Sequence, residues 1–146
     1  MIVKTEMLPS LSMTVAMVDG SFDPIHEGHI AYFKEAAELG YPLLCNIAPD
    51  AWTVKKHKLL LSQEQRSIVI DALRSIRFVH AAQISTLEVL QILQPALYVK
   101  GSDWKDRGGI PQDQQNLCEK IGIEVKYLDT VLNSSSDLIR KWSNKW

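Results

Sequence analysis

Short apolar runs alternate along this chain with longer stretches in which apolar residues recur every three or four positions. The short runs lack the polar alternation of half-exposed strands, which indicates strands buried on both faces. The longer stretches have the spacing of amphipathic helices. The expected strands are Thr14–Val18, Leu43–Ala48, Phe78–Ala82, Leu97–Lys100 and Glu124–Leu128. The expected helices are His29–Leu39, Gln63–Ile76, Thr86–Leu93, Gln112–Ile121 and Ser135–Trp142.

Alternation of strands and helices favours a parallel sheet with right-handed crossovers. Ser62, followed three residues later by Gln65, forms the pattern of a capping box at one helix start. Gly40 and Gly122 follow two helices where C-caps lie. We predict a single α/β domain over residues 14–146, a Rossmann-like doubly wound parallel sheet of about five strands. Residues 1–13 fit no element, and we expect an N-terminal arm that is flexible or part of a dimer contact.

Ligands of such sheets bind outside the carboxyl ends of the strands. The expected topology brings four polar loops to that edge, each directly after a strand or before the last helix. These loops are Asp19–His29, Pro49–Leu61, Lys100–Gly109 and Asn133–Asp137. The sequence therefore predicts a binding site along this edge.

Size and composition narrow the class of protein. The 146 residues suffice for one domain with a real core, and a net charge of −1 argues against a broad nucleic-acid surface. Cys45 and Cys118 make no disulfide framework and are expected to be free thiols. Polar residues interrupt the first thirteen positions, and no run of 18 apolar residues exists, so we expect no signal peptide and no membrane span. A cytoplasmic protein is the resulting expectation.

The segment Gly20–His29, with the sequence GSFDPIHEGH, carries the strongest chemical signal. It places His26 and His29 three residues apart at an expected strand-to-helix turn, on one face of the helix start. Unpaired N–H groups and the helix dipole make that end a natural seat for phosphate. A structural pair and a metal-binding pair are the alternatives. Zinc needs further ligands, and the other two histidines, His57 and His80, form no tight cluster with the cysteines.

This segment resembles the GxFDxxHxGH signature of the cytidylyltransferase-like nucleotidyltransferases. That family transfers a nucleotidyl group from CTP or ATP to a phosphate and releases pyrophosphate. The resemblance extends over about Thr14–Trp142 and implies that His26 and His29 hold and polarise the phosphates. It also implies that the turn itself binds the nucleotide, through Gly20, Ser21, Phe22, Asp23 and Gly28.

The residues of the turn also have plain structural explanations. Gly20 and Gly28 permit a close approach of the backbone to a ligand or a helix, and a generic turn explains either one equally well. Phe22 is expected to be an aromatic wedge beneath the loop rather than a direct ligand contact. Asp23 caps the turn or holds a side chain, and an Asx turn explains it equally well.

A basic cluster, Lys55, Lys56 and Lys58, follows the second expected strand. The family places basic residues here to meet the triphosphate and the acceptor phosphate. Lys58 precedes Arg66 by eight residues, which is similar to the heptose-phosphate adenylyltransferases, and both are catalytic candidates by this resemblance. The alternatives are a solvated basic loop for the lysines and a surface salt bridge for Arg66.

Two later segments also resemble family motifs. Lys100-Gly101-Ser102-Asp103-Trp104 is similar to the KGxDW/Y segment, in which the glycine lets the chain pass close to the nucleotide. The resemblance implies that Asp103 and Trp104 help to build the base and ribose pocket. The alternatives are a core position for Trp104 and a mere strand-end charge for Lys100.

Asn133 to Arg140 resembles the family's SSTxIR segment. It brings the hydroxyls of Ser134, Ser135 and Ser136 to a helix start, where they would form a second phosphate seat. A simple serine N-cap is the alternative.

Together these features predict an enzyme that transfers CMP or AMP from CTP or ATP to a small phosphorylated acceptor, a sugar or alditol phosphate. The resemblance implies Mg²⁺ as the cofactor and a homodimer as a frequent assembly. It is nearest to the glycerol-3-phosphate cytidylyltransferase and heptose-1-phosphate adenylyltransferase branches. Residues 128–132 lack the arginine that the glycerol-phosphate members carry there. Pro24 after Phe22 and Asp23 is similar to members that adenylate nicotinate mononucleotide or phosphopantetheine, but their downstream motifs differ from residues 100–104, which disfavours those members.

The alternative function is a non-catalytic nucleotide-binding regulatory module of the same fold. A dehydrogenase-type dinucleotide site is disfavoured because no GxGxxG follows the first expected strand.

Overall fold

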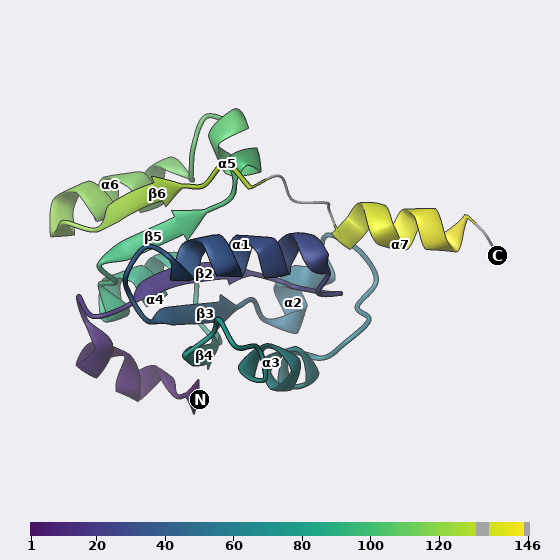
Figure 1. Ribbon diagram of the computed structural model, residues 1–146, viewed down its shortest axis with the longest axis horizontal. Helices are drawn as coiled ribbons and strands as arrows, with labels where there is room; N and C mark the ends of the chain where they lie inside the picture. Colours follow the sequence, from purple (N-terminus) through teal and green to yellow (C-terminus); the bar gives the residue numbers. More distant parts are fainter. Residues whose placement is uncertain (131–134, 145–146) are drawn as a thin grey trace.

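The computed structural model describes residues 1–130 and 135–144 (Figure 1). Within them a six-stranded sheet runs in the order β1-β4-β3-β2-β5-β6, and all of its pairings are parallel. The strands are β1 (Ile2–Val3), β2 (Ala16–Gly20), β3 (Leu43–Ile47), β4 (Phe78–Ala81), β5 (Leu97–Lys100) and β6 (Glu124–Tyr127). This arrangement confirms the predicted doubly wound α/β fold and adds one strand, β1, to the predicted five.

Helices cover both faces of the sheet (Figure 1). They are α1 (Glu27–Ala37), α2 (Asp50–Thr53), α3 (Gln63–Asp71), α4 (Thr86–Leu93), α5 (Ser102–Asp106), α6 (Gln112–Ile121) and α7 (Ser135–Ser143), together with a 3₁₀ helix, η1 (Thr5–Leu11). None of the helices in the described part of the chain is long and apolar enough to cross a membrane.

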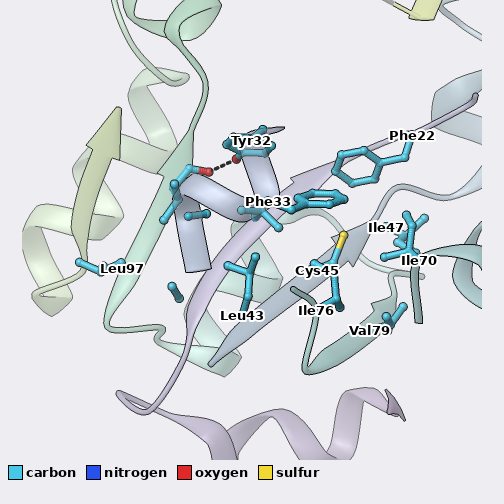
Figure 2. Close-up of a cluster of buried hydrophobic side chains, with 14 of the residues drawn as sticks. Phe22, Tyr32, Phe33, Leu43, Cys45, Ile47, Ile70, Ile76, Val79 and Leu97 are labelled. Carbon is cyan, nitrogen blue, oxygen red and sulfur yellow. Dashed lines mark hydrogen bonds between the residues drawn. The ribbon is translucent and has the colours of Figure 1, made fainter. Parts of the chain in front are cut away.

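Alternate residues of each strand pack into two separate cores, because successive side chains point to opposite faces of a sheet. Ala16 and Val18 of β2 face α1 and α3, in the cluster that Figure 2 shows around Phe33. Met17 faces the other way, toward η1, α4 and α6, where the buried face of α4 includes Leu90. The cysteines are free and buried, one in each core.

The first residues of the chain are part of the domain rather than a detached arm. Ile2 pairs with Val79 and Val3 pairs with His80, which adds β1 to the edge of the sheet. Leu8 of η1 is fully buried in the second core. A two-residue strand and a 3₁₀ helix that contains Pro9 have no periodicity that a sequence pattern could detect.

The longer predicted elements agree closely with the structure. The bounds of α4 and α6 match the prediction, and Ser62 and Gln65 form the expected capping box of α3. By contrast, α3 ends at Asp71 rather than at Ile76, although Leu73 and Ile76 still pack against the first core from the turns that follow. The pattern of apolar positions continues there because burial continues, although the helix does not.

The strand order creates a topological switch point at the centre of the sheet. From β2 the chain builds β3 and β4 on one side, and it then returns to build β5 and β6 on the other. Doubly wound sheets bind their ligands outside the carboxyl ends of the strands at such a point, and we call this region, beside the ends of β2 and β5, the crevice. The loops that follow β2, β3 and β5 all begin at this edge.

Candidate active site

The N-terminus of α1 is capped by two histidines. The backbone N–H of Gly28 donates to Nδ1 of His26 at 3.1 Å, and the N–H of His26 donates to Nδ1 of His29 at 3.3 Å. The two imidazole rings stack with their centroids 3.9 Å apart. The structure thus confirms that the pair lies together at a helix start, and α1 begins two residues earlier than predicted because His26 is its N-cap.

These hydrogen bonds assign the proton of each ring. Since Nδ1 accepts a backbone N–H in both rings, a neutral imidazole carries its proton on Nε2 and can donate it to an oxygen ligand. Burial, and secondarily the charge of His26, lowers the pKa of His29 from 6.5 to about 3. At neutral pH His29 is therefore a neutral hydrogen-bond donor at the positive end of a helix, an arrangement suited to a phosphate oxygen.

Phe22 supports this arrangement from beneath. Its ring is buried and meets the ring of His29 edge-on, with the centroids 5.1 Å apart. A Cβ atom added to Gly20 would lie 3.0 Å from the Phe22 ring, so position 20 has no room for a side chain. Phe22 has a φ of 52°, a strained value for a residue with a side chain. The expected aromatic wedge is confirmed, while a contact between Phe22 and a nucleotide stays a prediction.

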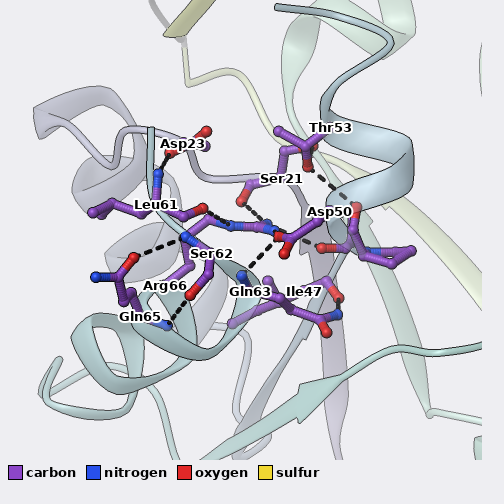
Figure 3. Close-up of polar contacts among 12 residues, drawn as sticks. Ser21, Asp23, Ile47, Asp50, Thr53, Leu61, Ser62, Gln63, Gln65 and Arg66 are labelled. Atoms are coloured by element: carbon purple, nitrogen blue, oxygen red, sulfur yellow. Dashed lines mark hydrogen bonds and ion pairs between the residues drawn. The ribbon is translucent and has the colours of Figure 1, made fainter. Parts of the chain in front are cut away.

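Asp23 ties the signature turn to the loop between α2 and α3 (Figure 3). Its side chain is fully buried, and its two oxygens accept the backbone N–H groups of Leu60 and Leu61 at 2.8 and 2.9 Å. The Asp23 carboxylate thus links two loops at the binding edge of the sheet. The sequence motif marks the residue but not its partners, because they lie 37 and 38 positions away.

Arg66 lies beneath the same loops and is only 1% exposed. Its guanidinium forms four bonds with protein groups: to the carbonyls of Leu61 (3.1 Å), Ser21 (2.7 Å) and Ala48 (3.0 Å), and to the Asp50 carboxylate (2.6 Å). Figure 3 shows these contacts, which we call the Arg66 clamp. This geometry differs from both sequence-based interpretations of Arg66, a surface salt bridge and a cation that contacts the substrate. The guanidinium is buried, and most of its bonds go to backbone carbonyls. Arg66 joins the ends of β2 and β3 to the α3 start.

The loop after β3 differs in character from the clamp beneath it. Thr53 of α2 is buried and donates to the hydroxyl of Ser21 at 3.0 Å. Beyond it Lys55, Lys56 and Lys58 are all exposed. The sequence motif favoured Lys58, but it is Lys56 whose pKa responds to charged groups of the opposite side.

The pKa of Lys56 is lowered, and charged groups from β2, from β5 and from the segment after β5 influence it. Burial among neighbouring atoms is the largest cause of its lowered pKa, even though part of the side chain reaches solvent. Lys100 and Arg107 lower this pKa further, whereas Asp19 and Asp103 raise it. The charges of the segment that follows β5 therefore act on the Lys56 ammonium.

The β5 side of the crevice is built around Lys100. Its Nζ lies 2.6 Å from Oδ1 of Asp19 and 4.5 Å from the centroid of the Trp104 ring. Tyr98 donates from its hydroxyl to the other oxygen of Asp19 at 2.9 Å. The motifs did not single out Asp19 or Tyr98. The available signal for Asp19 was a carboxylate at the end of the strand next to Gly20.

The segment after Lys100 forms the rim of the crevice. Gly101 is buried at the start of α5, while Asp103 and Trp104 are partly exposed. Oδ1 of Asp103 is buried and has no hydrogen-bond partner among residues 1–130 and 135–144. Trp104 is thus not a core residue but borders the site, with the cations of Lys100 and Arg107 near its ring.

The start of α7 reaches the signature turn. Ser135 donates from its hydroxyl to the carbonyl oxygen of Pro24 at 2.8 Å, across 111 positions of sequence. The fourth predicted segment therefore joins the site, as the sequence implied. Ser134 and the side chain of Ser136 lie outside what the structure describes.

Comparisons with known proteins agree with this geometry. The family model described as cytidylyltransferase-like matches residues 17–141. "Bifunctional protein HldE" of Campylobacter jejuni subsp. doylei is 32% identical over 136 residues, 90% of this chain but 28% of that relative. "FAD synthase" of Aciduliprofundum boonei is 30% identical over 138 residues, 88% of this chain and 90% of the relative. The chain thus spans about a quarter of the HldE proteins that it matches and most of the FAD synthase.

Solved structures support the fold at lower identity. A lipopolysaccharide core biosynthesis protein from Thermoplasma volcanium superposes with a TM-score of 0.66 at 23% identity, covering 82% of this chain and 99% of that one. A pantoate-beta-alanine ligase from Francisella tularensis, complexed with beta-gamma ATP and beta-alanine, gives 0.60 at 15% identity, over 99% of this chain and 77% of that one. The matched family model and the relatives together place the chain in a class of nucleotidyltransferases. The chain belongs to the cytidylyltransferase-like family.

Proposed function

We propose that this protein transfers CMP or AMP from CTP or ATP to a small phosphorylated acceptor and releases pyrophosphate. The observation that carries the proposal is the double-histidine cap of α1, with both Nε2 donors at a helix N-terminus beside the switch point. If His26 and His29 only capped the helix, no cations and no unpaired carboxylate oxygen would be expected on the other side of the crevice. Lys56, Arg107 and Asp103 supply these.

The reaction requires charge stabilisation rather than a covalent intermediate. An acceptor phosphate oxygen attacks the α-phosphorus of the nucleotide, the bond to the pyrophosphate breaks, and negative charge spreads over non-bridging oxygens. We assign His26 and His29 to donate hydrogen bonds to these oxygens as neutral imidazoles. Lys56, with Lys58 on the same loop, supplies mobile positive charge for the phosphates.

The β5 side is assigned to the nucleoside. The half-exposed ring of Trp104 offers a stacking face for a base. Oδ1 of Asp103 is placed to accept hydrogen bonds from ribose hydroxyls, which would satisfy a carboxylate oxygen that is buried and unpaired in the described residues. Gly101 allows the backbone to pass close to the ligand.

Mg²⁺ fits this site as an ion carried by the substrate. Among the described residues no group of three or more histidines, cysteines or carboxylates lies together. Mg²⁺ commonly binds through one or two carboxylates and substrate phosphates and keeps several waters. When bound, it neutralises the charge of the departing pyrophosphate.

The test is pyrophosphate release in the presence of Mg²⁺. CTP, ATP, GTP and UTP would each be combined with sugar, alditol and amino-alcohol phosphates. Flavin mononucleotide joins the panel because FAD consists of that phosphate linked to AMP and one relative is named FAD synthase. One productive pair would establish the reaction and both substrates. Saturable nucleotide binding without pyrophosphate release for any acceptor would instead favour the regulatory module.

The cytoplasm and a homodimer remain part of the proposal. The two free, buried thiols fit a reducing compartment. Sedimentation of the purified protein would decide the assembly.

A further inference from the structure

A buried ion pair lies in the centre of the sheet, where β2 and β5 end. Asp19 is near the end of β2 and Lys100 ends β5, and these strands are neighbours at the switch point. The two side chains are only 11% and 6% exposed, and Nζ of Lys100 lies 2.6 Å from Oδ1 of Asp19. Tyr98, which is 1% exposed, donates its hydroxyl to the other carboxylate oxygen at 2.9 Å. Groups of two central strands therefore hold the Lys100 ammonium in place.

The Trp104 ring is linked to this pair through Lys100. Nζ of Lys100 lies over the ring, 4.5 Å from its centroid, which is the geometry of a cation–π contact. Trp104 belongs to α5, which has no buried residue, so packing in a core does not lock its side chains. Arg107, the second cation near the ring, is the C-cap of α5 itself and is 65% exposed. The contact with Lys100 is therefore the one that connects the ring to the central strands.

The counter-charge of Asp19 is what allows a lysine to be buried at this position. An ammonium at this depth without a partner would carry a large desolvation penalty and would turn toward solvent. Because Lys100 is buried and paired, it has little surface left for a ligand. Its route to a bound nucleotide is the partly exposed Trp104 ring.

We propose that Asp19 is a positioning residue of the nucleoside pocket, which holds Lys100 against the Trp104 ring and so sets the orientation in which the ring meets a base. This role rests on the proposed function. It gives neither Asp19 nor Lys100 a contact with the reacting atoms. Nucleotide affinity then depends on both members of the ion pair, and it does so through Trp104.

The first test reports on the Trp104 ring without any substrate. The four tryptophans would be replaced by 5-fluorotryptophan, and the ¹⁹F NMR signal of Trp104 would be assigned by its loss in Trp104→Phe. We expect Asp19→Asn to shift this signal and to leave the other three in place, because the ammonium over the ring loses its anchor. Glu38→Gln, which removes an exposed charge at the far end of α1, is the control and should shift none of the four.

The second test measures equilibrium binding of ATP and CTP by calorimetry. A nucleotide is an anion, so a variant in which only the charge of Asp19 mattered would bind it more tightly. Positioning predicts the opposite sign: the dissociation constant should rise about fivefold in Asp19→Asn, because the ring no longer offers a fixed stacking face. The kcat at saturating nucleotide should change less than about threefold, since no group that touches the reacting atoms is removed.

Two double variants isolate the route of this effect. In Trp104→Ala, which lacks the ring, Asp19→Asn should cause no further loss of affinity, whereas independent contributions would add. Asp19→Asn combined with Lys100→Met removes both charges, so the net charge is unchanged and no buried charge is left unpaired. It should also weaken binding about fivefold, and it supplies the test if Asp19→Asn alone fails to fold.

The outcomes separate this inference from the proposed function. An unmoved Trp104 signal, tighter nucleotide binding, or an equal loss of affinity with and without the Trp104 ring would overturn the role of Asp19 while the wild-type activity stands. A wild type that binds neither nucleotide would overturn the proposed function. The ¹⁹F signal would still decide whether the ion pair fixes the ring.

Discussion

The two sides of the central crevice are built in opposite ways. On the β2 side, Asp23 and Arg66 are buried and each forms several hydrogen bonds to backbone groups that hold the signature turn. On the β5 side, Trp104 and Arg107 are partly or largely exposed and meet through a cation–π contact. One side is rigidly supported and the other is open at its rim.

This difference matches two different chemical tasks. Groups that stabilise a transition state act best when they are fixed before the substrate arrives, and the imidazoles of His26 and His29 are fixed in this way. Groups that recognise a base or an acceptor benefit from solvent access and adjustable side chains. The comparison predicts that changes on the β2 side reduce folding or turnover, whereas changes on the β5 side reduce affinity.

The largest effect is expected for Arg66→Met. The change removes four bonds and leaves three backbone carbonyls without their donor, so the free energy of unfolding should fall by about 3–5 kcal/mol. Urea denaturation measures this loss. Arg107→Met, on the exposed side, is the control and should change stability by less than about 0.5 kcal/mol. A loss below about 1 kcal/mol for Arg66→Met would contradict the rigid clamp.

Next in size is the effect of His29→Ala on turnover. Loss of one preorganised donor should lower kcat at least ~10²-fold while the fold is retained. Pyrophosphate release and far-UV circular dichroism would measure the two properties. His57→Ala removes a partly exposed imidazole whose hydrogen bond within the described residues is to the adjacent Lys58 carbonyl, and it should leave kcat nearly unchanged. Near-normal turnover in His29→Ala would exclude the proposed role.

The burial of His29 also predicts a pH dependence of stability. The pKa of His29 is about 3 in the folded protein and 6.5 for an unperturbed histidine, so the unfolded chain binds more protons between these pH values. Its stabilising contribution is therefore fully present above about pH 6.5 and is lost as the pH falls toward 3. From pH 7 to pH 5 the loss should be about 2 kcal/mol.

Comparison with His29→Asn isolates this contribution, because His80, another buried histidine with a lowered pKa, acts in the same direction in both proteins. Urea unfolding at the two pH values would show a steeper loss in the wild type. Equal losses in both proteins would mean that His29 is already charged or exposed, and that the β2 side is less rigid than the geometry indicates.

The long helices of this fold could be predicted because the spacing of their apolar residues repeats over several turns. The bounds of α4 and α6 followed from apolar spacing, and Gly122 marked the end of α6. By contrast, β1, α2 and α5 span two, four and five residues, too few for any periodicity. Their structure depends on contacts with distant segments, as the pairing of Ile2 with Val79 illustrates.

In the candidate site, too, features set by local spacing could be predicted and features set by distant contacts could not. Local spacing was enough to place His26 and His29 together at a helix start. It could not show that Arg66 turns inward, because its distant partners Ser21, Ala48 and Asp50 come from two other segments of the chain. Nor could it separate Lys56 from Lys58 or find the pairing of Asp19 with Lys100, since these depend on which strands become neighbours.

The smallest effect is expected for Trp104→Ala, on the open side. Loss of a stacking face should raise the dissociation constant of the nucleotide about tenfold, and kcat at saturating nucleotide should stay within about threefold because the imidazoles are untouched. Trp104→Phe keeps an aromatic face and should lose less. Calorimetric binding, together with thermal unfolding of each variant, distinguishes a ligand contact from a packing residue. If Trp104→Ala loses stability but binds nucleotide normally, the ring belongs to the protein interior, and the β5 side is more like the β2 side than its exposure indicates.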